Sequence, residues 1–260
     1  NDADTYDDIY KYVNDQSEEL KTAFYTALGR ERASKYRKVS DYPGLTSKNI
    51  IDLGENILVS TKKFDMGNGR TEGQPTEANA GLGYDDGFLG NTKIQRNKIE
   101  NITFEKSTAG ANETKWDVSE AGNGSILAWY EIVNSNGAVK VHIGSNGKIY
   151  ANPDSSYLFS WIASNNNNHN SICTATEVIT NIGLLDTTKV TNMEGMFRET
   201  GWSSMIKLDL GDNFDTSNVT SMKGMFRGTG YSSMQILRVG SKFNTTKVID
   251  MSNMFDCTGY

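Results

Sequence analysis

The chain has two histidines, His142 and His169, and their side chains are the ones best suited to proton transfer or metal binding near neutral pH. His142 lies in the alternating run 139–143, which predicts an outward-facing position on a β-strand. His169 follows a run of four asparagines and is expected to be solvated. Because the sequence places no nucleophile beside either ring, it predicts no Ser-His-Asp or Cys-His catalytic site.

Two pairs of carboxylates, Asp85 with Asp86 and Asp52 with Glu55, have the residue types that glycosidases use. Acidic pairs of this kind are usually solvated, and Asp85-Asp86 lacks the spacing of a calcium-binding loop. Catalysis would require two carboxylates that face each other in a cleft, about 5–9 Å apart. We therefore expect no enzyme activity, no cofactor and no metal site, and a glycan-active hydrolase is the less favoured alternative.

A repeat of constant period occupies the end of the chain, with units that begin at Asp186, Asp215 and Asn244. The first two units are identical at 17 of 29 positions. Apolar residues spaced by three, such as Val219 and Met222, predict one face of a short helix or 3₁₀ turn. The Met-x-x-Leu-x-Val pattern that follows predicts a short strand. Because one unit cannot cover its own apolar face, the units are expected to stack as a short solenoid.

Stacked units would bring equivalent side chains into rows. One row is aromatic and predicts a ladder that either packs a tight turn or binds a sugar or a partner surface. A second row holds two arginines, although the third unit has Asp256 at this position. The candidate binding residues are therefore Trp202, Tyr231 and Tyr260 in the aromatic row, and Arg198 and Arg227 in the basic row.

The two cysteines, Cys173 and Cys257, fall about three turns of the expected solenoid apart, or roughly 14 Å at strand spacing. A disulfide requires Cα atoms within about 7 Å of each other. The sequence therefore predicts no disulfide and two reduced thiols.

The region before the repeats is predicted to combine a helix with a sheet. Apolar residues at spacings of three, four and seven predict helical structure over residues 5–38. Residues 65–92 are rich in glycine and predict a long surface loop. Over residues 99–150 the apolar period changes to two, and Asn-Gly pairs at 136–137 and 146–147 predict turns between antiparallel strands.

The composition is typical of an extracellular protein rich in hydroxyl and amide side chains. The formal net charge is −6 and the basic residues are scattered, so no nucleic-acid partner is predicted. No run of 18 apolar residues occurs, so no membrane span is predicted within the chain. Because the chain begins with Asn1 rather than Met, any signal or anchor ahead of it is expected to have been removed.

Residues 215–226 read Asp-Thr-Ser-Asn-Val-Thr-Ser-Met-Lys-Gly-Met-Phe, and two sister copies flank them. This motif resembles the BspA-like leucine-rich repeat surface proteins of bacteria. Stretches within 116–129 and 143–159 look like the segment that precedes the repeats in such proteins, so the resemblance covers roughly residues 94–260. It implies an exported cell-surface protein that binds host, matrix or cell-surface molecules and has no catalytic residues. The chain departs from the family in having fewer than three full repeats.

A helix followed by an antiparallel meander also resembles, in architecture alone, the head of a type IV pilin. This second resemblance implies a minor pilin-like subunit, a structural pilus component that displays the repeat domain.

The expected fold class is α+β: an N-terminal helix with an antiparallel β-meander, followed by a short leucine-rich-type repeat solenoid. Two domains are expected, over residues 1–164 and 165–260. The expected function is a secreted, non-catalytic adhesion module at the bacterial cell surface, with an extracellular protein or glycan as its ligand. The pilin-like subunit is the alternative, with other pilus subunits as its partners.

Overall fold

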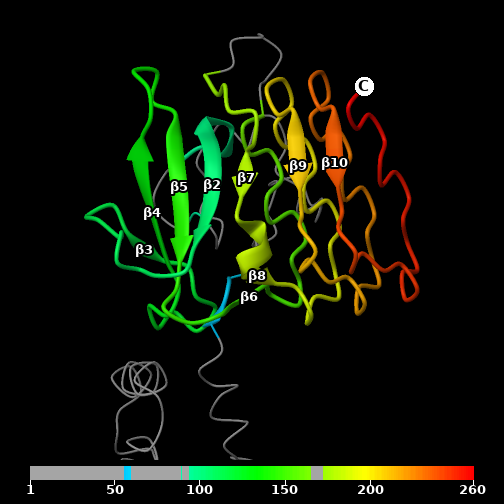
Figure 1. Cartoon of the computed structure of the whole chain (residues 1–260), viewed down its shortest axis with the longest axis horizontal. Helices are drawn as coiled ribbons and strands as arrows, with labels where there is room; N and C mark the ends of the chain where they lie inside the picture. Colours follow the sequence, from blue (N-terminus) through cyan, green and yellow to red (C-terminus); the bar gives the residue numbers. More distant parts are fainter. Residues whose placement is uncertain (1–55, 60–88, 90–93, 165–171) are drawn as a thin grey trace, which may run out of the picture.

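The computed structural model describes residues 56–59, 89, 94–164 and 172–260 (Figure 1). Several expectations concern residues outside this part of the chain, namely the helix over 5–38, all of the loop over 65–92 except Leu89, both acidic pairs, and His169.

The described residues fold into short strands joined by turns, and no α-helix is present among them. Two 3₁₀ helices of three residues each are the helical elements of this part. The elements in chain order are β1 (Asn56–Ile57), η3 (Arg96–Lys98), β2 (Ile99–Glu105), β3 (Trp116–Asp117), β4 (Leu127–Ile132), β5 (Val139–Gly144), β6 (Ile149–Tyr150), β7 (Ile179–Thr180), η4 (Ile182–Leu184), β8 (Leu185–Asp186), β9 (Lys207–Asp209) and β10 (Ile236–Arg238).

The largest sheet has five strands in the order β3-β4-β5-β2-β7 and mixes the two kinds of pairing. β4 and β5 run antiparallel and are joined by a turn at residues 134–137, where the sequence predicts one. β5 and β2 are parallel, as are β2 and β7. Successive side chains of a strand point to opposite faces. On β5 the side chains that face the core are those of Val139, Val141 and Ile143.

A second sheet connects the early part of the chain to the repeats. β6 lies between β1 and β8 and is parallel to both. Together with the β2–β7 pairing, this sheet joins elements on both sides of residue 164, and one apolar core includes residues from both sides. The expected domain boundary at 164 stays a prediction.

The repeats lie on one another in register. β9 and β10 are parallel, and Leu208 lies opposite Leu237, its equivalent in the next unit. Figure 1 shows these two strands side by side, with the chain of each unit returning beneath them. A second line of bridges connects Asp154, Asn192, Ser221 and Asp250. The segment that starts at Asp154 is therefore an additional layer ahead of the three repeats, and its step along the chain to Asn192 is longer than the later steps.

Alternate peptide groups hold the layers together. The N–H groups of Met193, Gly195, Phe197 and Glu199 donate to carbonyl groups of the next layer at 2.8–2.9 Å. The N–H groups between them, such as that of Met196, close turns within their own layer. In each layer the same three positions have left-handed backbone. In chain order of the four layers, these residues are Tyr157, Trp161 and Ala163; Gly195, Glu199 and Gly201; Gly224, Gly228 and Gly230; and Asn253, Cys257 and Gly259.

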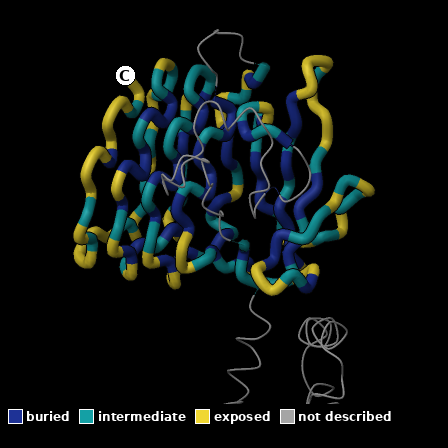
Figure 2. The backbone as a smooth tube through the Cα atoms, turned by 180° about the vertical axis from the view of Figure 1, so that it is seen from behind, coloured by how far each residue is buried: buried dark blue, intermediate teal, exposed yellow. Residues whose placement is uncertain are grey.

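A column of phenylalanine rings runs through the layers. Neighbouring ring centroids are 5.5 Å apart along the whole column. The rings of the first three layers are fully buried, whereas the ring of the last layer is 53% exposed. Figure 2 shows the same gradient along the backbone, from buried inner layers to a mostly exposed layer at the C-terminus. The column consists of Phe159, Phe197, Phe226 and Phe255.

The expected α+β fold class is wrong, because the described part of the chain consists of strands and turns in mixed sheets. The apolar spacing of three, as at Val219 and Met222, belongs to successive turns in which alternate N–H groups bond to the next layer. An α-helix would direct each of these N–H groups back into its own segment. A leucine-rich-type solenoid of helix and strand is therefore not what the repeats form.

The expected antiparallel meander is also wrong. β2 runs parallel to β5, and β6 leaves this sheet to pair with β1 and β8. Among the residues that the structure describes, none belongs to a helix with the length and apolar character needed to cross a membrane.

Phe197→Ala is expected to lower the free energy of unfolding by about 3–5 kcal/mol, because it removes a fully buried ring that stacks on two others. Phe255→Ala removes the equivalent ring of the last layer, which is already 53% exposed, and should cost much less. Chemical denaturation followed by circular dichroism would compare the two variants. Equal losses would contradict the layered packing.

Candidate functional site

The aromatic row predicted from the repeat forms a continuous stack. The rings of Trp202 and Tyr231 have centroids 4.2 Å apart and planes inclined by 11°. Those of Tyr231 and Tyr260 are 5.4 Å apart and inclined by 21°. Because Tyr231 is covered on both faces, the row can offer a full ring face to a sugar only at its ends. The geometry thus shows a packing contact between turns and leaves Tyr260, which is 86% exposed, as the accessible ring.

The two predicted arginines line one pocket on the repeat layers, with a volume of about 310 Å³. Arg227 Nε lies 3.1 Å from Asp256 Oδ2, so the acidic residue that breaks the row in the third unit pairs with the preceding arginine. Arg198 Nε lies 3.9 Å from Glu199 Oε1. The pocket is lined by Tyr157, Glu194, Gly195, Arg198, Lys223, Gly224, Arg227 and Asn253.

The pocket depends on a glycine at one repeat position. A Cβ atom on Gly224 would meet only Arg227 Cβ, at 3.8 Å, so this glycine leaves open space above the backbone. In the layer before, Tyr157 fills the corresponding space above Gly195, since a Cβ there would come 2.2 Å from the tyrosine ring. Tyr157 Oη donates to Glu194 Oε1 at 2.9 Å, which fixes this wall of the pocket. In the layer after, Asn253 takes the same left-handed conformation, with φ 55°.

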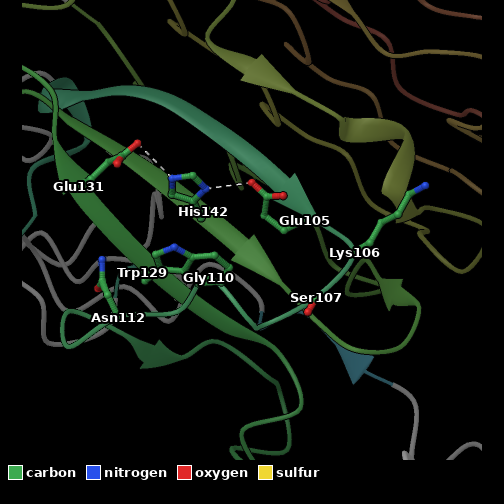
Figure 3. Close-up of a pocket in the computed structure, with 8 residues that line it drawn as sticks. All are labelled: Glu105, Lys106, Ser107, Gly110, Asn112, Trp129, Glu131 and His142. Atoms are coloured by element: carbon green, nitrogen blue, oxygen red, sulfur yellow. Dashed lines mark hydrogen bonds and ion pairs between the residues drawn. The ribbon is translucent and has the colours of Figure 1, made fainter.

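A second pocket, of about 450 Å³, lies on the outer face of the five-stranded sheet (Figure 3). Trp129 on β4 and His142 on β5 are direct cross-strand partners, and their rings stack at 5.2 Å with planes inclined by 4°. The segment from Ser107 to Asn112 closes over the indole: a Cβ atom on Gly110 would come 3.3 Å from Trp129 Cζ2. Trp129 is thereby 4% exposed although it lies on the outer face.

Two carboxylates flank His142 along the sheet. His142 Nδ1 lies 3.0 Å from Glu105 Oε1 on β2, and Nε2 lies 3.5 Å from Glu131 Oε1 on β4. Figure 3 shows the three side chains in a line, with the imidazole in the middle and Trp129 beneath it. The His142 side chain is 14% exposed, and those of Glu105 and Glu131 are 38% and 56% exposed.

The sequence reasoning missed this group because it depends on which strands are neighbours. The alternation along 139–143 places His142 on the outer face of β5, as the sequence predicts. The two carboxylates come from β2 and β4, and the β2–β5 contact is a parallel pairing of strands that are far apart in the chain. The available signal was local: Glu131 follows Trp129 by two residues and so shares its face.

The chemistry open to this group is hydrogen bonding and proton transfer. The two nitrogens of an imidazole point in opposite directions, so His142 and both carboxylates do not converge on one ion. No set of three or more metal-binding side chains is grouped together among residues 56–59, 89, 94–164 and 172–260.

The two cysteines lie in different environments, and no disulfide joins them. Cys173 is buried, and its Sγ donates to the carbonyl of Asn97 at 3.3 Å. Burial, with a smaller contribution from Glu100, raises the pKa of the Cys173 thiol to about 12. Cys257 is exposed, and a hydrogen bond with Asp256 raises the pKa of its thiol.

At pH 8, a thiol reagent is expected to modify Cys257 in the folded protein and to leave Cys173 unmodified, because the thiolate is the reactive form and Cys173 is buried with a pKa of about 12. Denaturation should expose the second thiol. In Cys257→Ser, modification should therefore be absent from the folded protein and reach one equivalent after unfolding. Rapid modification of Cys173 in the folded variant would show that this part of the core is open.

Comparison with known proteins concerns the repeat region. A family model described as "Mycoplasma protein of unknown function, DUF285" matches residues 166–259. No curated protein and no solved structure matches the chain. The repeats are thus similar to those of a family that has no assigned function.

Proposed function

We propose that the chain is a non-catalytic binding module at a bacterial cell surface, and that the pocket on its repeat layers binds acidic groups of an extracellular ligand. The observation that carries the proposal is the set of cations in this pocket. Arg198, Lys223 and Arg227 line it, whereas Glu194 is its one carboxylate-bearing residue.

Two of these cations have unused hydrogen-bonding capacity. Arg227 engages Asp256 through Nε, and its two terminal nitrogens have no acceptor among the described residues. Lys223 Nζ lies 3.8 Å from Glu194 Oε1, beyond hydrogen-bond distance. Their side chains are 41% and 49% exposed, so a carboxylate, sulfate or phosphate oxygen can reach both of them. Guanidinium groups are well suited to such oxyanions because they bind them through two parallel N–H groups.

The cell-surface part of the proposal rests on the resemblance of the repeat to BspA-like surface proteins. The matched family is described as a Mycoplasma protein, which agrees with a bacterial source. The helix that a pilin-like subunit requires and the acidic pairs that a carboxylate hydrolase requires lie outside the described residues, and the antiparallel meander that the pilin resemblance also requires is not formed. Neither alternative therefore gains support from an observation.

The repeats themselves supply substitutions that the backbone accepts. Lys223→Ser copies Ser252, its equivalent in the next layer, and Gly224→Asn copies Asn253, which has the same positive φ. Each variant is expected to weaken binding of an acidic ligand by about tenfold: the first removes a hydrogen bond to a charged group, and the second fills the pocket. Lys242→Ser removes the same charge from an exposed site outside the pocket and should leave binding unchanged.

The measurement is retention of purified protein on an array of sulfated, uronic-acid and neutral glycans and on immobilised extracellular-matrix proteins. We expect retention on acidic members, reduced by Lys223→Ser and Gly224→Asn at unchanged melting temperature. Retention on neutral members alone, or equal losses in Lys242→Ser, would overturn the proposal.

A further inference from the structure

When the imidazole is neutral, the pocket around His142 contains a mismatch in hydrogen bonding. A neutral imidazole carries one proton, and the 3.0 Å contact between Nδ1 and Glu105 Oε1 assigns that proton to Nδ1. Nε2 is then an acceptor, and it faces Glu131 Oε1, a second acceptor, at 3.5 Å. In the other neutral tautomer, the same conflict moves to Glu105. Two acceptors that face each other require a donor between them or an additional proton on the ring.

We propose that this pocket binds a primary ammonium group, which donates to His142 Nε2 and to Glu131 Oε1 and takes the place of the additional proton. The ammonium group has three donors and a positive charge, and so satisfies both acceptors at once. Glu105 acts as a positioning residue, because its bond to Nδ1 keeps the lone pair of Nε2 directed toward Glu131. Trp129 holds the imidazole from below through ring stacking. This site lies on the five-stranded sheet and does not depend on the function proposed for the repeat layers.

Neither of the two lysines near His142 occupies the position proposed for the ammonium group. Lys140 precedes His142 by two residues on β5 and lies opposite Glu131 in the register, but it forms no ion pair among the described residues. Lys106 lines the pocket, and Figure 3 shows its side chain directed away from His142. The pocket volume of about 450 Å³ accommodates an alkylammonium group.

Binding at this site is coupled to pH. Protonation of the ring turns Nε2 into a donor toward Glu131, which satisfies the carboxylate and repels an ammonium group. The ligand therefore binds the neutral imidazole, and its affinity falls as the pH falls. The charged groups that face the ring are Glu105 on β2, Glu131 on β4 and Lys140 on its own strand.

The test uses propylammonium as the probe, 1-propanol as the neutral control, and the indole N–H signal of Trp129 in ¹H–¹⁵N spectra as the readout. At pH 8 we expect a saturable shift with propylammonium and none with propanol. At pH 5.5 the affinity should be weaker, because a protonated ring has no lone pair at Nε2 to accept from the ammonium group. Propylammonium itself stays charged over this range.

Three variants separate the ammonium site from nonspecific charge attraction. Glu131→Gln should weaken binding at pH 8 by about tenfold or more, the loss of one charge-assisted hydrogen bond. His142→Gln should remove the pH dependence. Glu177→Gln makes the same charge change at an exposed position outside the pocket and should have no effect.

Absence of a saturable shift at pH 8 would overturn the proposal and leave solvent as the bridging donor. It would also be overturned by equal affinity at both pH values in the wild type, by an equal loss in Glu177→Gln, or by a pH dependence that survives in His142→Gln.

Discussion

The structure depends on hydrogen bonds between layers that are formed by alternate peptide groups of each repeat. In every inner layer, four N–H groups point toward the next layer and the intervening ones close turns within their own layer. Three fixed positions of each layer have left-handed backbone, and glycine, which adopts this conformation without strain, occupies six of these twelve positions. The hydrogen bonds between layers recur at the same offset along the chain from unit to unit, which keeps the register constant.

The register between layers determines which side chains lie next to each other on the surface. Equivalent side chains lie one strand spacing apart and form rows, so a different residue in one repeat unit alters one member of a row. Tyr157 covers Gly195, whereas the space above Gly224 stays open, and the next layer continues with Ser252 and Asn253; this irregularity creates the pocket. The sheet beside the layers produces a site of another kind: cross-strand neighbours from β2, β4 and β5 bring two carboxylates and a histidine together. One site is rich in cations and the other in acceptors, which suits a binding protein with separate contacts.

The sequence predicted the features that depend on residues close to one another in the chain. It located the repeat, the aromatic row, the shared position of the two arginines and the turn at 134–137. It did not predict the layer that begins at Asp154, because the step from there to Asn192 is longer than the repeat and Tyr157 replaces the usual glycine. Each repeat was expected to contain a short helix or a 3₁₀ turn; the helix is absent, because a spacing of three also fits successive turns. The histidine site was missed because the β2–β5 pairing is long-range.

Amide hydrogen exchange, resolved by residue, tests the layered arrangement most directly. Strong protection is expected for the N–H groups of Met193, Gly195 and Phe197, which donate to the next layer. Fast exchange is expected for Met251, Asn253 and Phe255, the equivalent groups of the last layer, which have no acceptor among the described residues. Fast exchange in both sets would contradict the account, because it would mean that the layers are not joined through these peptide groups.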